Sequence, residues 1–285
     1  MNEYPFEVVV FSGGGFRAFA HIGALKAIEE TGRILDGITT FVGTSSGALV
    51  AAYAAYGLTA DEIYEEAINI DITSMFKLSA RALLKDSALY DVSKFREYLA
   101  RFFGDTTLAD LHERSGKHVA FVVYDATACT VRLWSSETTP AIKVSDALYT
   151  SCAIPIMFPT TMYDGHVYYD GGAIDNFPVR YYKDKHTLGI RFANAPGNYS
   201  LTTCNDGISR VVKSFIQTAS ISASAFDEYH EGYDSDRLLY VINLPVDPSL
   251  WIKFSMSDAT KRRLFDIGHL QTELKLSTVV STASE

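Results

Sequence analysis

The chain is 285 residues long and 47% hydrophobic, so it is large enough to bury one sizeable core. Its formal net charge of −9 disfavours nucleic acid as a partner and gives no general attraction to anionic membranes. The longest apolar stretch, Ala48 to Tyr56, is about half the ~20 residues that span a bilayer, and the N-terminus lacks the basic segment of a secretory signal. Three cysteines without CxxC spacing, Cys129, Cys152 and Cys204, indicate reduced thiols rather than a disulfide framework. We therefore expect a cytoplasmic protein.

Patterns typical of strands and of helices alternate along the chain. We expect strands near residues 7–11, 38–42, 118–124, 130–135, 166–170, 187–192 and 238–243. We expect helices at residues 16–31, 46–56, 60–69, 92–103, 144–151, 208–227 and 258–276. No linker, repeat or low-complexity tract divides the chain, and alternation of this kind favours a parallel sheet. The sequence therefore predicts a single domain over residues 1–285 with an α/β fold, a three-layer α/β/α sandwich around a mostly parallel central sheet.

The first strand pattern ends in a glycine-rich turn, residues 12–17. It contains three consecutive glycines, Gly13, Gly14 and Gly15, whose N–H groups can converge on one point because glycine has no Cβ. A helical pattern follows at once, so the positive end of its dipole reinforces these amides. Such a nest suits an oxyanion that forms on a carbonyl group under attack. We therefore expect an oxyanion hole here.

Two questions about this first turn stay open at the sequence level. Arg17 would either fix the shape of the nest or bind an anionic head group of the substrate, with an ordinary surface arginine as the alternative. The run from Gly13 through Gly15 to Ala18 also fits a relaxed dinucleotide-binding pattern. That pattern requires an acid at the end of the second strand, whereas Asp36 precedes the strand. A nucleotide is therefore disfavoured.

The second glycine-rich turn has the Gly-x-Ser-x-Gly pattern at residues 43–47, directly after the strand pattern of residues 38–42. This pattern places a serine, here Ser45, on a tight strand-to-helix bend whose flanking glycines let the backbone pack closely and expose the hydroxyl. Both turns belong at the carboxyl ends of neighbouring strands, where open α/β sheets place their sites. We expect Ser45 to be a nucleophile; the alternative is an ordinary strand-to-helix turn with an idle serine.

None of the seven histidines is an evident base for this serine, but one carboxylate is well placed. Asp170 ends a strand pattern that follows an Asp164-Gly165 turn, and Gly171 and Gly172 come directly after it. This arrangement aims a carboxylate into a site, although a turn-forming Asp-Gly pair is the alternative. Because an ordinary aspartate titrates near ~3.9, a Ser–Asp dyad requires a dry site that raises the pKa of the carboxyl group.

The three glycine-containing motifs, in this order and with the third far downstream, resemble the signatures of the patatin-like phospholipases. Residues 151–159 are similar to the Pro- and Phe-containing segment that the family carries before its aspartate, and Asn176-Phe177-Pro178 matches the Asn-x-Pro that follows it. The resemblance covers residues 6 to about 195. One departure is Ser12, which stands where many members have Gly or Asp.

This resemblance implies a patatin-like fold and the hydrolysis of lipid acyl esters, as by a phospholipase A or a lysophospholipase. It implies a catalytic dyad of Ser45 and Asp170, an oxyanion hole from the amides of Gly13 to Gly15, an acyl-enzyme intermediate, and no metal or other cofactor. Two alternatives stay open. The same dyad would also serve soluble esters or thioesters, and a conventional Ser-His-Asp α/β-hydrolase is disfavoured because that fold places its elbow after several strands.

Two segments are candidates for transient contact with a membrane surface, which would make the protein a peripheral membrane protein. The first is residues 72–89, where apolar residues alternate with three cations spaced four apart as on one helical face, Lys77, Arg81 and Lys85. A surface helix with a solvated basic face is the alternative. The second is the aromatic pair Trp251 and Phe254, which would otherwise fill a core.

Overall fold

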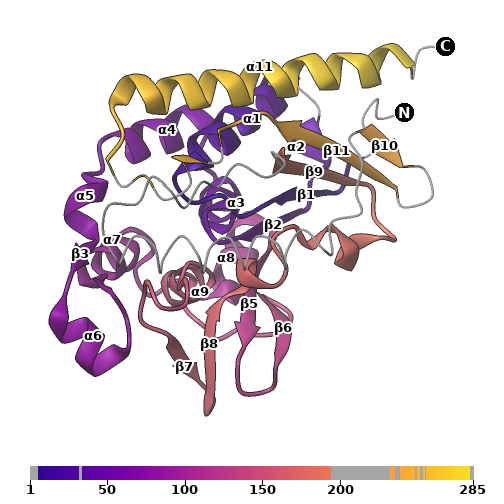
Figure 1. Cartoon of the computed structure of the whole chain (residues 1–285). Coiled ribbons are helices and arrows are strands. Elements are labelled where there is room, and N and C mark those ends of the chain that lie inside the picture. Colours follow the sequence, from indigo (N-terminus) through magenta and orange to yellow (C-terminus); the bar gives the residue numbers. More distant parts are fainter. Residues whose placement is uncertain are drawn as a thin grey trace.

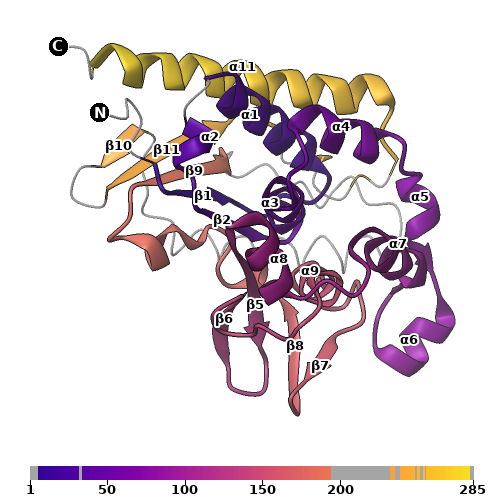
Figure 2. The same cartoon turned by 180° about the vertical axis from the view of Figure 1, so that it is seen from behind.

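The computed structural model describes residues 6–31, 34–193, 232–234, 238–247, 249–250, 253 and 255–282 (Figures 1 and 2). The strands of its main sheet are β1 (Val8–Phe11), β2 (Thr40–Thr44), β5 (His118–Asp125), β6 (Thr130–Ser135), β7 (Thr161–Tyr163), β8 (His166–Asp170), β9 (Thr187–Phe192), β10 (Gly232–Asp234) and β11 (Leu239–Leu244). The helices are α1 (Ala18–Glu30), α2 (Ile34–Gly37), α3 (Ser46–Tyr56), α4 (Ala60–Ile68), α5 (Ile72–Met75), α6 (Ala80–Asp86), α7 (Ser93–Phe103), α8 (Leu108–Ser115), α9 (Val144–Ser151) and α11 (Asp258–Thr282). Shorter elements are the strands β3 (Lys77–Leu78) and β4 (Tyr90–Asp91) and the 3₁₀ turns η1 (Gly15–Arg17), η2 (Gly171–Ala173) and η3 (Pro178–Tyr182).

The main sheet is mixed, with the strand order β10-β11-β9-β1-β2-β5-β8-β7 and with β6 beside β5. Its five central strands, from β11 to β5, run parallel, whereas the pairings of β10, β6, β8 and β7 are antiparallel. The α/β fold with helices on both sides is therefore confirmed, and the parallel arrangement is limited to the centre of the sheet.

The central strands are continuous apolar runs because both faces of the sheet are covered. In β1, Val9 and Phe11 pack in the core shared with α1 and α3. Val8 and Val10 point to the opposite face, where they pack with Val179 of η3. The long helix α11 runs beside α1 in both views (Figures 1 and 2). The carboxyl ends of the central strands are thereby fixed on a rigid core.

The elements expected from sequence are present within the described residues, with boundaries shifted by a few positions. The second strand begins at Thr40 rather than at residue 38, because residues 34–37 form α2 and Ile38 is buried in the core. The expected helix at 208–227 and the residues Trp251 and Phe254 lie outside the described residues. No helix in the described ranges is both long and apolar enough to cross a bilayer.

Residues 72–89 do not form a single helix, so the expectation of one helical face for the three cations is wrong. The chain is extended at Phe76, after α5, and enters β3, which pairs with β4. A new helix, α6, begins after Ser79, whose Oγ accepts a hydrogen bond from the Ala82 N–H at 3.1 Å. Lys77 therefore lies on a strand, while Arg81 and Lys85 lie on α6.

Candidate active site

The topology of the sheet brings Ser45 and Asp170 together. Strand β2 pairs with β5 in parallel up to Thr44, opposite Val122, and β8 pairs with β5 in antiparallel fashion, with Asp170 opposite Val123. Because β6 occupies the other edge of β5, β2 and β8 share one edge. Their carboxyl ends therefore meet head to head, which places Ser45, the residue after β2, beside the last residue of β8.

Ser45 occupies a sharp turn between β2 and α3, with φ of 54° and ψ of −124°. A positive φ is uncommon for a residue with a side chain, and backbone strain of this kind concentrates at functional sites. The turn is held by Ser151 Oγ, which accepts a hydrogen bond from the Ser45 N–H at 3.0 Å and donates one to the Val122 carbonyl at 2.8 Å. Gly47 lies so close to the Phe11 carbonyl that a Cβ would collide with it. This is the geometry of a nucleophile elbow.

Asp170 is buried, with only 4% of its surface exposed. Its N–H donates to the Ala153 carbonyl at 2.9 Å, and its Oδ1 accepts a hydrogen bond from the Gly172 N–H at 2.7 Å. Burial raises the pKa of Asp170 to about 7, although hydrogen bonds from the Ser45 side chain and from Gly172 act in the opposite direction. A carboxyl group that titrates near neutral pH can accept a proton from a hydroxyl group and return it.

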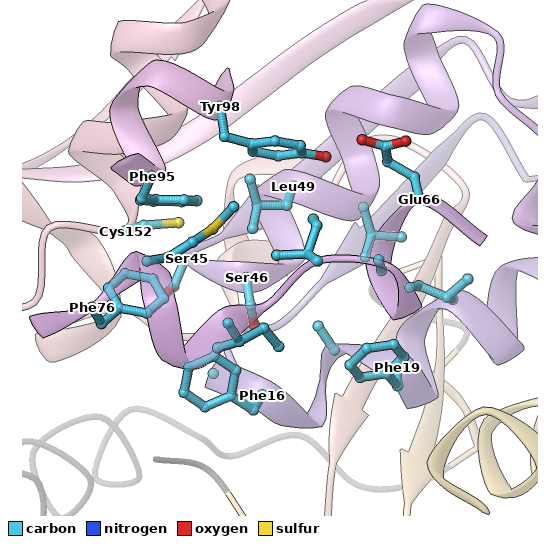
Figure 3. A pocket seen from close by; sticks show the side chains of 18 of the residues that line it. Phe16, Phe19, Ser45, Ser46, Leu49, Glu66, Phe76, Phe95, Tyr98 and Cys152 are labelled. Carbon is cyan, nitrogen blue, oxygen red and sulfur yellow. The ribbon is translucent and has the colours of Figure 1, made fainter. Parts of the chain in front are cut away.

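An apolar cavity of ≈ 180 Å³ opens beside Ser45 (Figure 3). Its walls come from η1, α1, α3, α4, α5 and α7, from the residue after α5 and from residues 152–158, and they include Phe16, Phe19, Leu49, Phe76, Phe95 and Met157. A water needs about 10–15 Å³ on the same measure, so the cavity has room for on the order of ten methylene groups. Such a lining favours a hydrocarbon chain over a polar ligand.

The three loop glycines differ in how their amides are used. The Gly13 N–H donates to the Asn176 carbonyl at 3.1 Å, and Asn176 Nδ2 donates back to the Gly13 carbonyl at 3.1 Å. The Gly14 N–H donates to Ser46 Oγ at 3.1 Å. Gly15 lines the cavity, and its N–H has no hydrogen-bond acceptor among the described residues. The Gly13 N–H is thus already used in a hydrogen bond within the protein, whereas the Gly15 N–H is available to a ligand in the cavity.

Arg17 lies beneath the loop and is 8% exposed. Its Nε donates to the Gly14 carbonyl at 3.2 Å, and its guanidinium group stacks 4.3 Å from the centroid of the Phe192 ring. Arg17 is not part of the cavity lining. Its position supports the loop-shaping role and not the expected binding of a substrate head group.

The histidines that the structure describes do not contact the dyad through hydrogen bonds. His21 is fully buried, with Nε2 2.9 Å from the Ser12 carbonyl, and burial lowers its pKa to about 3, so it stays neutral and structural. His230 lies outside the described residues. Likewise, no group of three or more His, Cys, Asp or Glu side chains in the described ranges is arranged to hold a metal ion.

Sequence reasoning missed two residues of the site, Ser151 and Cys152. Ser151 holds the elbow, as described above. Cys152 lines the cavity; burial, with a further contribution from Asp170, raises the pKa of its thiol well above the usual range. Cys152 therefore stays a thiol and does not compete as a nucleophile. The only sequence signal for either residue was membership of the segment 151–159.

Comparison with known proteins assigns the family. A model described as patatin-like phospholipase matches residues 9–182, a range that contains the glycine loop, the elbow and Asp170. Because the match spans more than half of the chain, the chain belongs to the patatin-like phospholipase family, and it is a hydrolase that acts on lipid esters. The resemblance seen in the sequence is thereby confirmed.

Individual relatives are more distant. The chain is 26% identical to a probable lipid hydrolase, 463L, of Invertebrate iridescent virus 6, over 61% of this chain and 62% of the relative. It is 31% identical to the human omega-hydroxyceramide transacylase over 63% of this chain, but this covers only 33% of the human protein. The crystal structure of VipD from Legionella pneumophila matches with a TM-score of 0.59 at 16% identity, over 98% of this chain and 67% of VipD. The match to VipD concerns the fold alone.

Proposed function

We propose that this chain is a single-domain lipid acyl hydrolase of the phospholipase A or lysophospholipase type, with Ser45 as nucleophile and Asp170 as general base. The observation that carries the proposal is the position of Ser45: it lies on a strained elbow, beside a buried carboxyl group whose pKa is raised to about 7, and it lines an apolar cavity. Each of these features is unfavourable for stability or solvation, and together they suit acyl transfer.

The chemistry follows from the contacts of the dyad. With the acyl chain in the cavity, Ser45 Oγ attacks the ester carbonyl while the Asp170 carboxylate accepts the hydroxyl proton. The negative charge on the carbonyl oxygen is stabilised by the Gly15 N–H, and by the Gly14 N–H once it exchanges its bond to Ser46; each such donor is worth about 3–4 kcal/mol. The protonated Asp170 then gives the proton to the leaving alcohol, which leaves an acyl ester on Ser45. Water attacks this ester while the Asp170 carboxylate accepts a proton from it; Asp170 then returns that proton to Ser45 Oγ as the acyl–oxygen bond breaks, which releases the fatty acid and restores the enzyme.

The cavity favours a lipid substrate over the alternative of a soluble short ester or thioester. Binding of an acyl chain against aromatic and aliphatic side chains is favoured by about 25 cal/mol for each Å² of apolar surface that is removed from water. A short acyl group would leave most of this surface uncovered. The relatives are consistent with this, because one is named as a probable lipid hydrolase and another as a transacylase of a ceramide. The conventional Ser-His-Asp mechanism gains no support from the described histidines.

Purified protein and mixed phospholipid vesicles provide the test. Fatty acid release measured by lipid mass spectrometry is expected for the wild type and is expected to be absent from Ser45→Ala. Ser115→Ala, a change at the distant end of α8, serves as the matched control and should keep full activity. Fatty acid release by Ser45→Ala at more than about a hundredth of the wild-type rate would exclude Ser45 as the nucleophile.

A further inference from the structure

A hairpin beside the cavity exposes apolar side chains to an unusual degree. Residues 77–91, here called the α6 hairpin, comprise β3, α6 and β4 and project from the body of the molecule (Figure 1). Leu84 is 88% exposed, Leu78 61% and Leu83 51%. Ile156, which adjoins the hairpin, is 42% exposed. Large aliphatic side chains gathered on one projection are typical of a surface that meets a membrane or a partner.

The same hairpin carries cations beside these leucines. Lys77, Arg81 and Lys85 are exposed, and the carboxylates on the hairpin are Asp86 and Asp91, so its net charge is positive although the whole chain carries −9. On α6, Ala82 faces the protein and is 5% exposed. At about 100° per residue, Leu84 then lies on the outer side of the helix with Leu83 on one side of it, and Arg81 and Lys85 both lie on its other side. Leucines bordered by cations are typical of segments that lie in the interface of anionic bilayers.

The α6 hairpin is joined to two walls of the cavity. Phe76, which precedes β3, lines the cavity and stacks on Phe158, with ring centroids 5.1 Å apart. On the returning arm, the Leu89 N–H donates to the Ile156 carbonyl at 2.8 Å.

Ile156 also has an unusual backbone. Its φ is 70°, a conformation that a β-branched residue rarely adopts. Its neighbours Ile154 and Met157 line the cavity, while Ile156 itself points outward and is partly exposed. The returning arm of the hairpin is thus hydrogen-bonded to the segment that supplies part of the cavity wall.

We propose that the α6 hairpin and Ile156 form the docking surface for a bilayer that contains anionic phospholipid. The leucines enter the interfacial region and the cations bind lipid phosphate and carboxylate groups. A protein partner fits less well, because lysine is depleted from protein–protein interfaces. Docking in this orientation places the cavity, which can accept a hydrocarbon chain, next to the acyl chains of the bilayer. This inference rests on the proposed function in one respect: it takes the lipid of the docked bilayer to be the substrate.

The test measures binding separately from hydrolysis. Co-sedimentation uses vesicles of equimolar phosphatidylcholine and phosphatidylserine and protein with Ser45→Ala, so that the lipid is not consumed. Replacing both Leu83 and Leu84 by Gln is expected to weaken binding by roughly tenfold or more. The matched control replaces Leu270 and Leu274, which are 59% and 56% exposed on α11, at a distance from the hairpin (Figure 1); this variant should bind like the parent.

Three outcomes would overturn the docking surface: unchanged binding of the hairpin variant, an equal loss in the α11 control, or equal binding of the parent to pure phosphatidylcholine. Circular dichroism melting checks that each variant is folded. The same leucine changes in the active protein should leave hydrolysis of a soluble short-chain ester unchanged. If the wild type does not hydrolyse any ester but its vesicle binding depends on Leu83 and Leu84, the proposed function fails and the docking surface stands.

Discussion

The raised pKa of Asp170 predicts that replacing this carboxyl group, the proposed general base, stabilises the fold. Its pKa rises from the ordinary 3.8 to about 7 in the folded protein, a shift of about three units. At ~1.36 kcal/mol per unit, the folded state is destabilised by up to about 4 kcal/mol once the carboxyl group is ionised. Asp170→Asn removes the charge and keeps an acceptor for the Gly172 N–H. The variant should therefore be inactive yet more stable than the wild type at pH 8.

Because the pKa of Asp170 is raised and not lowered, the destabilisation by its charge should appear as the pH increases. Below about pH 4 the carboxyl group is protonated in both the folded and the unfolded state, so the charge contributes nothing. Between about pH 4 and pH 7 the folded state holds the proton more tightly, and stability falls as the pH rises. Above about pH 7 the full destabilisation is present. The difference in the free energy of unfolding between Asp170→Asn and the wild type should therefore grow from pH 4 to pH 7 and then stay level.

Urea denaturation at a series of pH values, with equal m-values for the two proteins, measures this difference. Asp125 provides a control, because its side chain is also inaccessible to solvent but its pKa is lowered: burial acts to raise it, and hydrogen bonds from the Ala128 N–H and from His166 outweigh burial. Asp125→Asn should lose stability at pH 8. The reasoning is refuted if Asp170→Asn is less stable than the wild type at pH 8, or if its advantage is the same at pH 4.

Four further predictions address the site and its surroundings. With ionised Asp170 as the proposed base, kcat/KM for a soluble ester should rise with pH through about 7; a profile that stays flat down to pH 5 argues against this role. Ser151→Ala removes the hydrogen bonds that tie the Ser45 N–H to the Val122 carbonyl, so kcat should fall at least tenfold with KM little changed. Hydrolysis should persist in excess EDTA, since the proposed steps use only side chains and amides; complete loss that calcium restores contradicts it. Replacing Lys77, Arg81 and Lys85 by Gln should weaken binding to anionic vesicles by ~100-fold at low salt, with less effect at high salt, and spare a short-chain ester; equal effects on both substrates would show that the cations are structural.

Local patterns were sufficient to predict the central strands and to single out Ser45 and Asp170 as candidate site residues. Continuous apolar runs identify strands covered on both faces, and glycine-containing turns mark Ser45, which follows β2, and Asp170, which ends β8. The antiparallel approach of β8 to β5, which makes the two strand ends meet, involves residues over forty positions apart and has no local signal. The predicted dyad therefore depended on the family resemblance as well as on the motifs.

The details that sequence reasoning missed all depend on long-range contacts. Gly13 is hydrogen-bonded to Asn176, which lies 163 positions away in the chain. The run of glycines alone therefore could not indicate that the Gly13 N–H already has a hydrogen-bond acceptor. The partner of the Ser45 N–H is Ser151, 106 positions away. Residues 72–89 have helical spacing, but tertiary pairing of β3 with β4 overrides it.

The most direct measurement of the central claim is covalent capture of the nucleophile. A fluorophosphonate that carries an alkyl chain is attacked by an activated serine and stays bound to it, and intact-mass and peptide mass spectrometry locate the adduct. We predict one adduct per chain on the peptide that contains Ser45, a rate of labelling at least a hundredfold lower in Asp170→Asn, and no adduct in Ser45→Ala. An adduct on another residue, or equal labelling of Ser45→Ala and the wild type, would contradict the account.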